Sequence, residues 1–195
     1  MFSIIKKQLK PAYLMLLWMT LLTGLAYPLA MTGIARMLFP DQAEGSLIRR
    51  DGAVVGSRLV GRDFASPGSF HGRPSATAPY AYNAAASTGS NLGPTNPALA
   101  DAVAERKTTL AAENGGENAP MDLLTASGSG LDPHISPEAA AFQVPRVAKA
   151  RHLSQEVVAA LVERNTEGRL WGLWGEPRVN VLGLNLALDA LTAKE

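Results

Sequence analysis

The pattern of apolar positions is densest near the start of the chain. Residues 11–35 contain no charged side chain over 25 positions. At a rise of about 1.5 Å per residue, a helix of this length spans roughly 38 Å, more than the hydrocarbon core of about 30 Å. The pattern predicts a transmembrane helix over residues 11–35. A cleaved signal peptide is the alternative, although its apolar part usually has only about 7–15 residues.

The charges on either side of this run predict its orientation. Lys6, Lys7 and Lys10 precede it, whereas Arg36 alone follows it closely. Segments rich in lysine and arginine stay in the cytoplasm. We therefore expect residues 1–10 to be cytoplasmic and residues 36–195 to form a single extracytoplasmic domain.

Patterns typical of strands occur at two places in that domain. Residues 46–62 predict a β-hairpin with Asp51-Gly52 at its turn. In residues 179–188, VNVLGLNLAL, valine and leucine alternate with asparagine and alanine. This alternation predicts a second strand, with a bulge near Gly183. Residues 121–126 predict a short apolar strand or turn.

Three helices have recognisable starts. Asn96 followed by proline predicts an N-cap for a helix over residues 97–112, and Ser136 followed by proline predicts another. Pro145 predicts a break or kink in that second helix. Ser154 is the expected cap of the third. Helices and strands together predict an α+β fold.

Residues 63–96 differ from everything around them. This segment is rich in Gly, Ser, Pro, Asn and Ala and has no apolar period. Thirty-four residues without a helix or strand is long for a compact domain, so the segment is either disordered or a binding loop. Phe70, Tyr80 and Tyr82 argue against full disorder, because aromatic residues are scarce in disordered segments.

Charge and composition exclude several functions. The net charge of +1 combines +4 over residues 1–36 with −3 over residues 37–195. A slightly acidic domain does not fit nucleic-acid binding, which needs a basic face. The chain has no cysteine, which excludes disulfides and thiolate sites. The histidines do not show the spacing of a zinc site.

The stretch TASGSGLDPHIS, residues 125–136, contains the residue types of a serine hydrolase. Ser129, Asp132 and His134 are crowded together, and the G-x-S-x-G elbow of hydrolases is missing. Catalytic triads are usually gathered from separate parts of the chain. We favour a structural role, in which hydroxyls, Asp132 and the glycines satisfy the backbone of a turn.

Other polar and aromatic positions have two interpretations each. STGSNLGPTNP, residues 87–97, is either a phosphate-binding loop before a helix or a turn with an N-cap. Asn180 and Asn185 either line a polar face or are solvated. Trp171 and Trp174 belong either to the core or to an anchor on a partner or membrane surface.

Several blocks of the chain carry a family resemblance. FHGRPSA, STGSNLGPTNP, MDLLTASGSGLDPHISPEAA, QVPRVAKAR and GEPRVNVLGLNLALD follow the N-terminal apolar run in this order. Together they resemble the C-subunit family of the bacterial Kdp potassium-transporting ATPases over nearly the whole chain. The block SGSGLDPHISP is the most specific of them.

This resemblance implies a non-catalytic accessory subunit in the bacterial inner membrane. Its implied partners are a channel-like A subunit that selects potassium, a P-type ATPase B subunit and a small F subunit. The chain itself would hold no cofactor, because ATP and the potassium ion are bound by the complex. The family is described as a catalytic chaperone that raises the ATP affinity of the pump.

Direct ATP binding conflicts with the predicted topology. The glycine-serine stretch has been likened to an ABC-transporter signature, but here it reads STGS, with Thr88 interrupting the pattern. ATP is cytoplasmic, and only about ten residues of this chain are expected there. We therefore expect any effect on ATP affinity to be indirect.

The same resemblance suggests that the family blocks are docking surfaces, with the outer domain over the potassium entrance of the A subunit. The docking candidates are Arg73, Ser75, Ser90, Asn91, Ser129, Asp132, His134, Arg146, Asn180 and Asn185. Two rival functions remain, a membrane-anchored serine hydrolase that uses Ser129 and His134, and an independent solute-binding domain built on residues 63–96.

Overall fold

The computed structural model of the chain describes residues 2–50, 52–116 and 118–192. Met1, at the start of the predicted cytoplasmic segment, and Asp51, in the predicted hairpin turn, lie outside the described residues. The chain divides into two compact units, Met1–Leu47 and Ile48–Glu195, and each is considered by itself.

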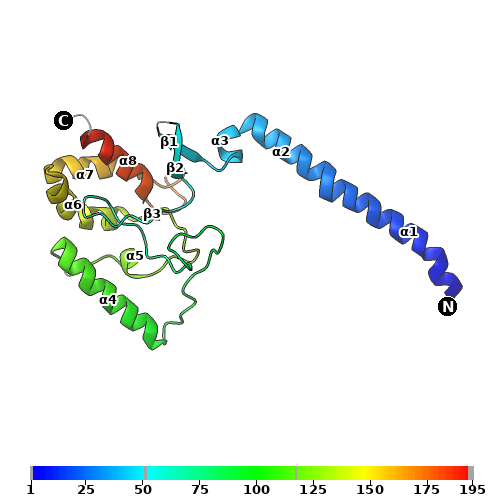
Figure 1. Ribbon diagram of the computed structural model, residues 1–195, viewed down its shortest axis with the longest axis horizontal. Helices are drawn as coiled ribbons and strands as arrows, with labels where there is room; N and C mark the ends of the chain where they lie inside the picture. Colours follow the sequence, from blue (N-terminus) through cyan, green and yellow to red (C-terminus); the bar gives the residue numbers. More distant parts are fainter. Residues whose placement is uncertain (1, 51, 117, 193–195) are drawn as a thin grey trace. The chain divides into compact units, whose positions relative to one another are not determined.

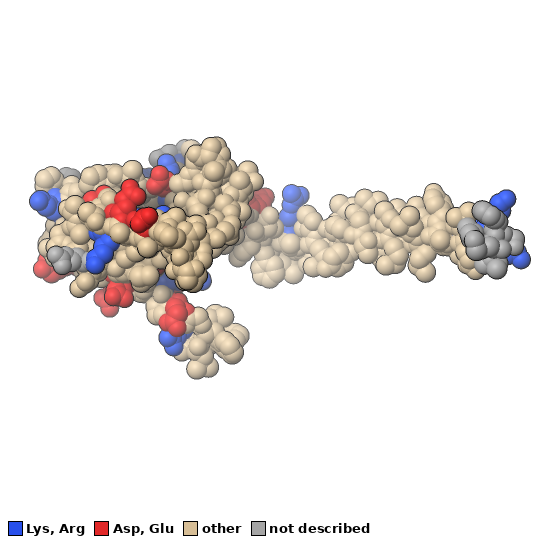
Figure 2. Space-filling view, turned by 90° about the horizontal axis from the view of Figure 1, so that it is seen from below, with Lys and Arg blue, Asp and Glu red and all other residues tan. Residues whose placement is uncertain are grey.

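The first unit is a long apolar helix. It consists of α1 (Phe2–Leu21), the π-helical turn η1 (Leu22–Ala26) and α2 (Tyr27–Leu38), followed by the short α3 (Pro40–Ala43). Over Lys6–Leu38 this is the one helix, among the described residues, that is long and apolar enough to cross a membrane. Figure 2 shows the extended run of uncharged side chains along it.

The π-helical turn lies just before Pro28, where the sequence permits a proline kink. A proline lacks the N–H for the usual helical bond and its ring crowds the carbonyl four residues back. The helix widens at this point, and Tyr27 N donates to Leu22 O, five residues earlier. The hydroxyl of Thr23, within this turn, donates to Met19 O at 2.6 Å in the last turn of α1. A widened turn thus accommodates the proline inside a continuous helix.

The second unit contains two small sheets and five helices among its described residues (Figure 1). The hairpin of β1 (Leu47–Arg50) and β2 (Ala53–Ser57) confirms the predicted hairpin. The other sheet has the antiparallel order β3 (His134–Ile135), β5 (Arg178–Asn180) and β4 (Thr166–Glu167). Its register pairs Ile135 and Thr166 with Val179. The domain is therefore α+β, as predicted.

The predicted helix starts are confirmed. α4 (Pro97–Asn114) begins at Asn96, whose side chain accepts a hydrogen bond from Ala98 N, and ends at Gly115 with φ +70°. α6 (Pro137–Arg151) and α7 (Gln155–Arg164) begin at Ser136 and Ser154, which cap them in the same way. Of the break or kink predicted at Pro145, the break is wrong, because α6 runs through this residue. Pro145 itself is exposed, and the residues on either side of it, Val144 and Arg146, are buried, so packing keeps this part of α6 helical.

Two other local predictions are also wrong. Residues 121–126 contain a short helix, α5 (Met121–Leu124), in place of a strand or turn. In residues 179–188 only the first two positions belong to a strand, and α8 (Val181–Thr192) follows directly. The apolar residues Val181, Leu184 and Leu188 also fit a helical period, and all three are buried.

The core of the domain lies among α6, α7, α8 and strand β5. Its largest fully buried apolar side chains are Phe70, Val147, Val158, Val179, Leu184 and Leu188. All of these except Phe70 lie in helices or in the sheet. Phe70 belongs to the long loop of residues 63–96, which contains no helix or strand and nevertheless contributes a fully buried side chain. The loop is therefore an integral part of the domain.

Candidate functional site

The loop of residues 63–96 is held to the core by side-chain amides. Asn185, on α8, donates through Nδ2 to Phe70 O at 2.9 Å and accepts from Phe70 N through Oδ1 at 2.8 Å. Gln143, on α6, accepts from His71 N at 2.8 Å and donates to His71 O at 3.1 Å. Both amides are buried. They take the place of a neighbouring strand, because they satisfy N–H and C=O of consecutive residues.

Arg146 extends this set of contacts. Its guanidinium donates to Ser69 O at 3.0 Å, to Gln143 Oε1 at 2.7 Å and to Asn114 Oδ1 at 2.9 Å, and it also donates to Pro67 O. Burial lowers the pKa of Arg146, and the nearby charge of Glu113 opposes that shift. Arg146 and Asn185 are thus engaged within the domain and position the loop.

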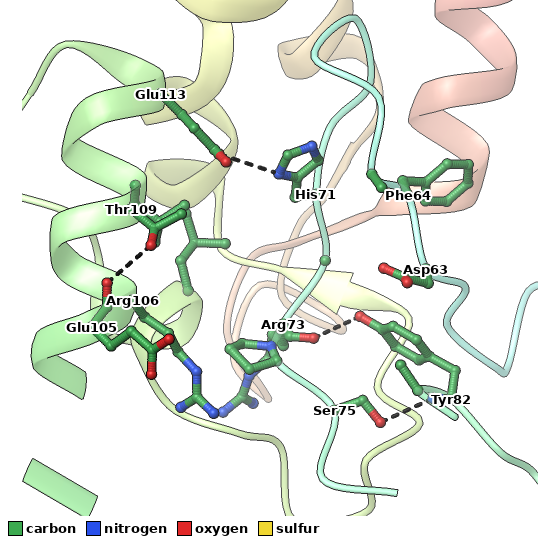
Figure 3. Close-up of a pocket in the computed structure, with 16 residues that line it drawn as sticks. Asp63, Phe64, His71, Arg73, Ser75, Tyr82, Glu105, Arg106, Thr109 and Glu113 are labelled. Carbon is green, nitrogen blue, oxygen red and sulfur yellow. Dashed lines mark hydrogen bonds and ion pairs between the residues drawn. The ribbon is translucent and has the colours of Figure 1, made fainter. Parts of the chain in front are cut away.

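Ser75 connects the loop to the SGSGLDP block. Its hydroxyl donates to Gly130 O at 2.7 Å and accepts from Tyr82 N at 2.9 Å. The phenol of Tyr82 donates to Arg73 O at 2.6 Å, two residues before Ser75 (Figure 3). Burial, with the negative charges of Asp63 and Asp132, raises the pKa of Tyr82 to about 12. The phenol therefore stays protonated and keeps this bond at neutral pH.

Arg73, Asp132 and His134 form a charged cluster at the edge of the three-stranded sheet. Arg73 Nη1 donates to Asp132 Oδ2 at 3.1 Å, while Asp132 Oδ1 accepts from His134 N at 3.0 Å. His134 Nδ1 lies 3.7 Å from the same carboxylate. Burial disfavours the carboxylate, but hydrogen bonds from His134 and Arg73 outweigh it and lower the pKa of Asp132. All three side chains are about a quarter exposed, whereas the Nε atom of Arg73 is buried and has no hydrogen-bond partner.

The serine of the suspected triad has a different role. Ser129 Oγ accepts from Leu131 N at 3.1 Å, while Ser129 O accepts from Thr88 N at 3.1 Å and from Ser87 Oγ at 3.0 Å. The SGSGLDP block and residues 87–89 therefore pair through their backbones. At Gly130, with φ +68°, an added Cβ would lie 2.6 Å from Thr88 O. These contacts support the structural interpretation of the block.

Three more predicted residues lie apart from this cluster. Ser90 and Asn91 are exposed, and Asn91 has φ +54°. Asn180 is half-buried, donates to Arg58 O at 3.0 Å and accepts from Gly183 N at 3.0 Å, so it caps the start of α8. In residues 87–97, the side chain of Asn96 is an N-cap, which favours the second interpretation of that stretch.

A cavity of about 470 Å³ opens between the loop and α4 (Figure 3). Charged side chains of both signs line it, among them Asp63, Arg73, Glu105, Arg106 and Glu113. His71 Nδ1 lies 3.8 Å from Glu113 Oε2. Burial and the charge of Arg146 lower the pKa of His71, against the opposing influence of Ser66 O, Glu113 and Asp63. The mixture of charges suits polar contacts with a partner better than one small ion.

Sequence reasoning missed Gln143, Tyr82 as a hydrogen-bond donor, and Arg106 and Glu113 on α4. Gln143 carried a usable signal. It lies on the same helical face as Ala139, Ala140 and Val147, where a polar residue must find a buried partner. Among the described residues, no group of three or more metal-ligating side chains is close enough to hold an ion.

Comparisons with known proteins agree with the predicted resemblance. The family model described as "KdpC: K+-transporting ATPase, c chain" matches residues 9–190. A potassium-transporting ATPase KdpC subunit from Bradyrhizobium diazoefficiens is 60% identical, over 96% of this chain and 99% of the relative. The KdpC subunit from Methylococcus capsulatus is 62% identical, over 93% and 97%. The one from Dechloromonas aromatica is 57% identical, over 96% and 99%. This chain therefore belongs to the KdpC family, the c chain of the K+-transporting ATPase.

Proposed function

We propose that this chain is a non-catalytic accessory subunit of a potassium-uptake ATPase, in which another subunit hydrolyses ATP. The observation that carries the proposal is the family match over residues 9–190, which includes both the apolar helix and the outer domain. The hydrogen bonds of Ser127 and Ser129 within and around the SGSGLDP block support an architectural role for these serines. Its partners are the potassium-selecting A subunit, the ATPase B subunit and the small F subunit.

The proposed location is the bacterial cytoplasmic membrane, with the N-terminus inside and residues 36–195 outside. The excess of lysine before the apolar helix supports this orientation. Alkaline phosphatase fused after Thr192 should be active, because it folds only outside the cytoplasm, and green fluorescent protein fused there should be dark. A bright green fusion with an inactive phosphatase would reverse the orientation.

The outer domain is proposed to dock on the outer face of the A subunit, above the potassium entrance. The accessible part of the candidate set is the cluster of Arg73, Asp132 and His134, with the exposed Ser90 and Asn91. The buried Arg146 and Asn185 act by fixing the loop that carries Arg73.

Co-purification of the tagged full chain from membranes tests this assembly. The parent chain should bring down the other subunits, whereas Arg73→Ala and His134→Ala should reduce their yield or raise the potassium concentration for half-maximal ATPase activity. Arg49→Ala, at an exposed arginine of β1, is the matched control. Normal assembly and normal potassium dependence in both site variants would remove these residues from the docking surface.

An effect on ATP affinity fits this architecture only as a coupling through the complex. A subunit with its bulk outside changes ATP affinity if it favours one conformation of the ATPase. The KM for ATP of the assembled complex should rise when this chain is left out. Photoaffinity labelling by an ATP analogue should mark the ATPase subunit and leave this chain unlabelled. Strong labelling of residues 87–97 would show that this chain contacts ATP directly and would contradict indirect coupling.

A further inference from the structure

Four large apolar side chains are exposed on a narrow hairpin between β4 and β5. The exposed fractions are 61% for Leu170, 83% for Trp171, 77% for Leu173 and 68% for Trp174. Leu170 N donates to Trp174 O at 2.8 Å, and Trp174 N donates back to Leu170 O at 3.0 Å. These two bonds close the hairpin, so the apolar side chains project from a defined backbone.

Two solvent-exposed ion pairs lie at the base of the hairpin. Arg169 Nη2 donates to Glu176 Oε2 at 2.8 Å, and Arg178 Nε donates to Glu167 Oε2 at 2.9 Å. Arg178 lies next to Val179, which is fully buried in the central strand. The tip is therefore tied to the most buried part of the sheet. Such preorganisation reduces the entropy lost when a tip is bound.

The apolar area of the tip is large for a free surface. Aromatic side chains have about 150–250 Å² of surface each, so two largely exposed tryptophans with two exposed leucines present on the order of 500 Å². A patch of this size is at the upper end for a monomer and usually marks an interaction site. Trp171 also has φ +52°, a region that costs a bulky residue about 1–2 kcal/mol. The native fold thus holds this tryptophan outward at a cost to its own stability.

The net charge of the hairpin indicates whether its partner is a protein or a lipid surface. Surface binding to anionic membranes is favoured by an excess of lysine and arginine around the apolar residues. Here Arg169 and Arg178 are both paired with glutamates, so residues 167–178 have no net charge. A neutral apolar tip of tryptophan and leucine matches the centre of a protein interface, where charged residues are depleted.

We infer that the hairpin of residues 169–176 inserts into an apolar pocket on another subunit of the ATPase complex. The inference rests on the proposed function and adds the surface through which it acts. Trp171 and Trp174 are the anchors, and the two backbone hydrogen bonds between Leu170 and Trp174 hold the tip in the bound shape. The sequence left open whether the two tryptophans belong to the core, to an anchor on a membrane surface or to an anchor on a partner. We infer that they are an anchor on a partner.

Photo-crosslinking in the full complex tests the inference. Benzoylphenylalanine is placed at Trp171 or at Trp174, with a matched control at Val157, an exposed apolar position on α7. Irradiated membranes should yield an adduct between position 171 or 174 and another subunit, and the control position should yield none. Adducts with lipid alone, with a second copy of this chain or with nothing, in a complex that still co-purifies, would overturn the inference and leave the proposed function standing.

A second measurement guards against misfolding. Trp171→Ser and Trp174→Ser should each weaken subunit association at least about 30-fold, as expected for anchors at the centre of an interface. Because both side chains are exposed, the thermal midpoint of the full chain in detergent should stay within a few degrees. Unchanged association in the double variant would also overturn the inference. If the parent chain brings down no other subunit, the proposed function itself fails.

Discussion

Asn185 and Phe70 are 115 positions apart, yet the side chain of one pairs with both backbone groups of the other. Asn185→Ala should lower the free energy of unfolding by about 2–4 kcal/mol, because it leaves a buried N–H and a buried C=O without partners. Urea unfolding of the full chain in detergent measures the loss. Asn118→Ala, at an exposed asparagine, is the control and should change it by less than about 0.5 kcal/mol.

Replacement of Arg146 by the shorter lysine should destabilise the domain. A lysine carries the charge but lacks the fork that reaches Ser69 O, Gln143 Oε1 and Asn114 Oδ1 together. Arg146→Lys should therefore cost about 2–3 kcal/mol in unfolding free energy, with the same change at the exposed Arg164 nearly neutral. Equal midpoints for the two variants in a thermal melt would contradict this account.

The lowered pKa of Asp132 should make the stability of the folded chain depend on pH. Its pKa in the folded chain lies below the ordinary value of 3.8, so the folded state favours the carboxylate. The contribution is fully present well above pH 3.8 and is lost as the pH falls through the lowered pKa. Asp132→Asn should reduce stability at pH 7 by about 1 kcal/mol and flatten the dependence below pH 4. A parent and variant that lose stability in parallel through that range would show that other carboxyl groups are responsible.

Two glycines with similar backbone angles allow the cost of steric crowding by a new side chain to be measured apart from the cost of a left-handed backbone angle. Gly130 has φ +68° and Gly115 has φ +70°, but a Cβ at Gly130 would meet Thr77 Cγ2 and Thr88 O at 2.6 Å, whereas the space at Gly115 is open. Gly115→Ala should cost about 1 kcal/mol for the left-handed angle alone. Gly130→Ala should cost about 1–3 kcal/mol more, as overpacking usually does. Thermal melts of the two variants provide the comparison.

The elements that the sequence predicted correctly are those with local signals. Asn96, Ser136 and Ser154 cap their helices because an N-cap needs only a side-chain acceptor and the next few backbone amides. The prediction failed for residues 181–188. Leucine stands at every second position there, as in a strand, but several of the apolar residues also have the spacing of one face of a helix. Val181, Leu184 and Leu188 satisfy both periods, and the helix is observed because it buries all three against the core.

The candidate site was predicted less well for a similar reason. Arg73, Asp132 and His134 were named, but their contacts join segments 59 residues apart. Gln143 was missed because its partner, the backbone of His71, is 72 residues away. Residues 63–96 lack periodicity because their order comes from side chains on α6 and α8. No pattern within the segment could show this.

The amide pairing also determines how the long loop exchanges with solvent. The backbone N–H groups of Phe70 and His71 are hydrogen-bonded to side chains on two different helices. A proton at either position is released to deuterated water only when the corresponding helix separates from the loop. These two amides should therefore exchange at rates typical of core helices, although they lie in a segment without helix or strand. A perturbation that loosens α6 or α8 would therefore also loosen residues 63–96, although this segment contains no helix or strand of its own.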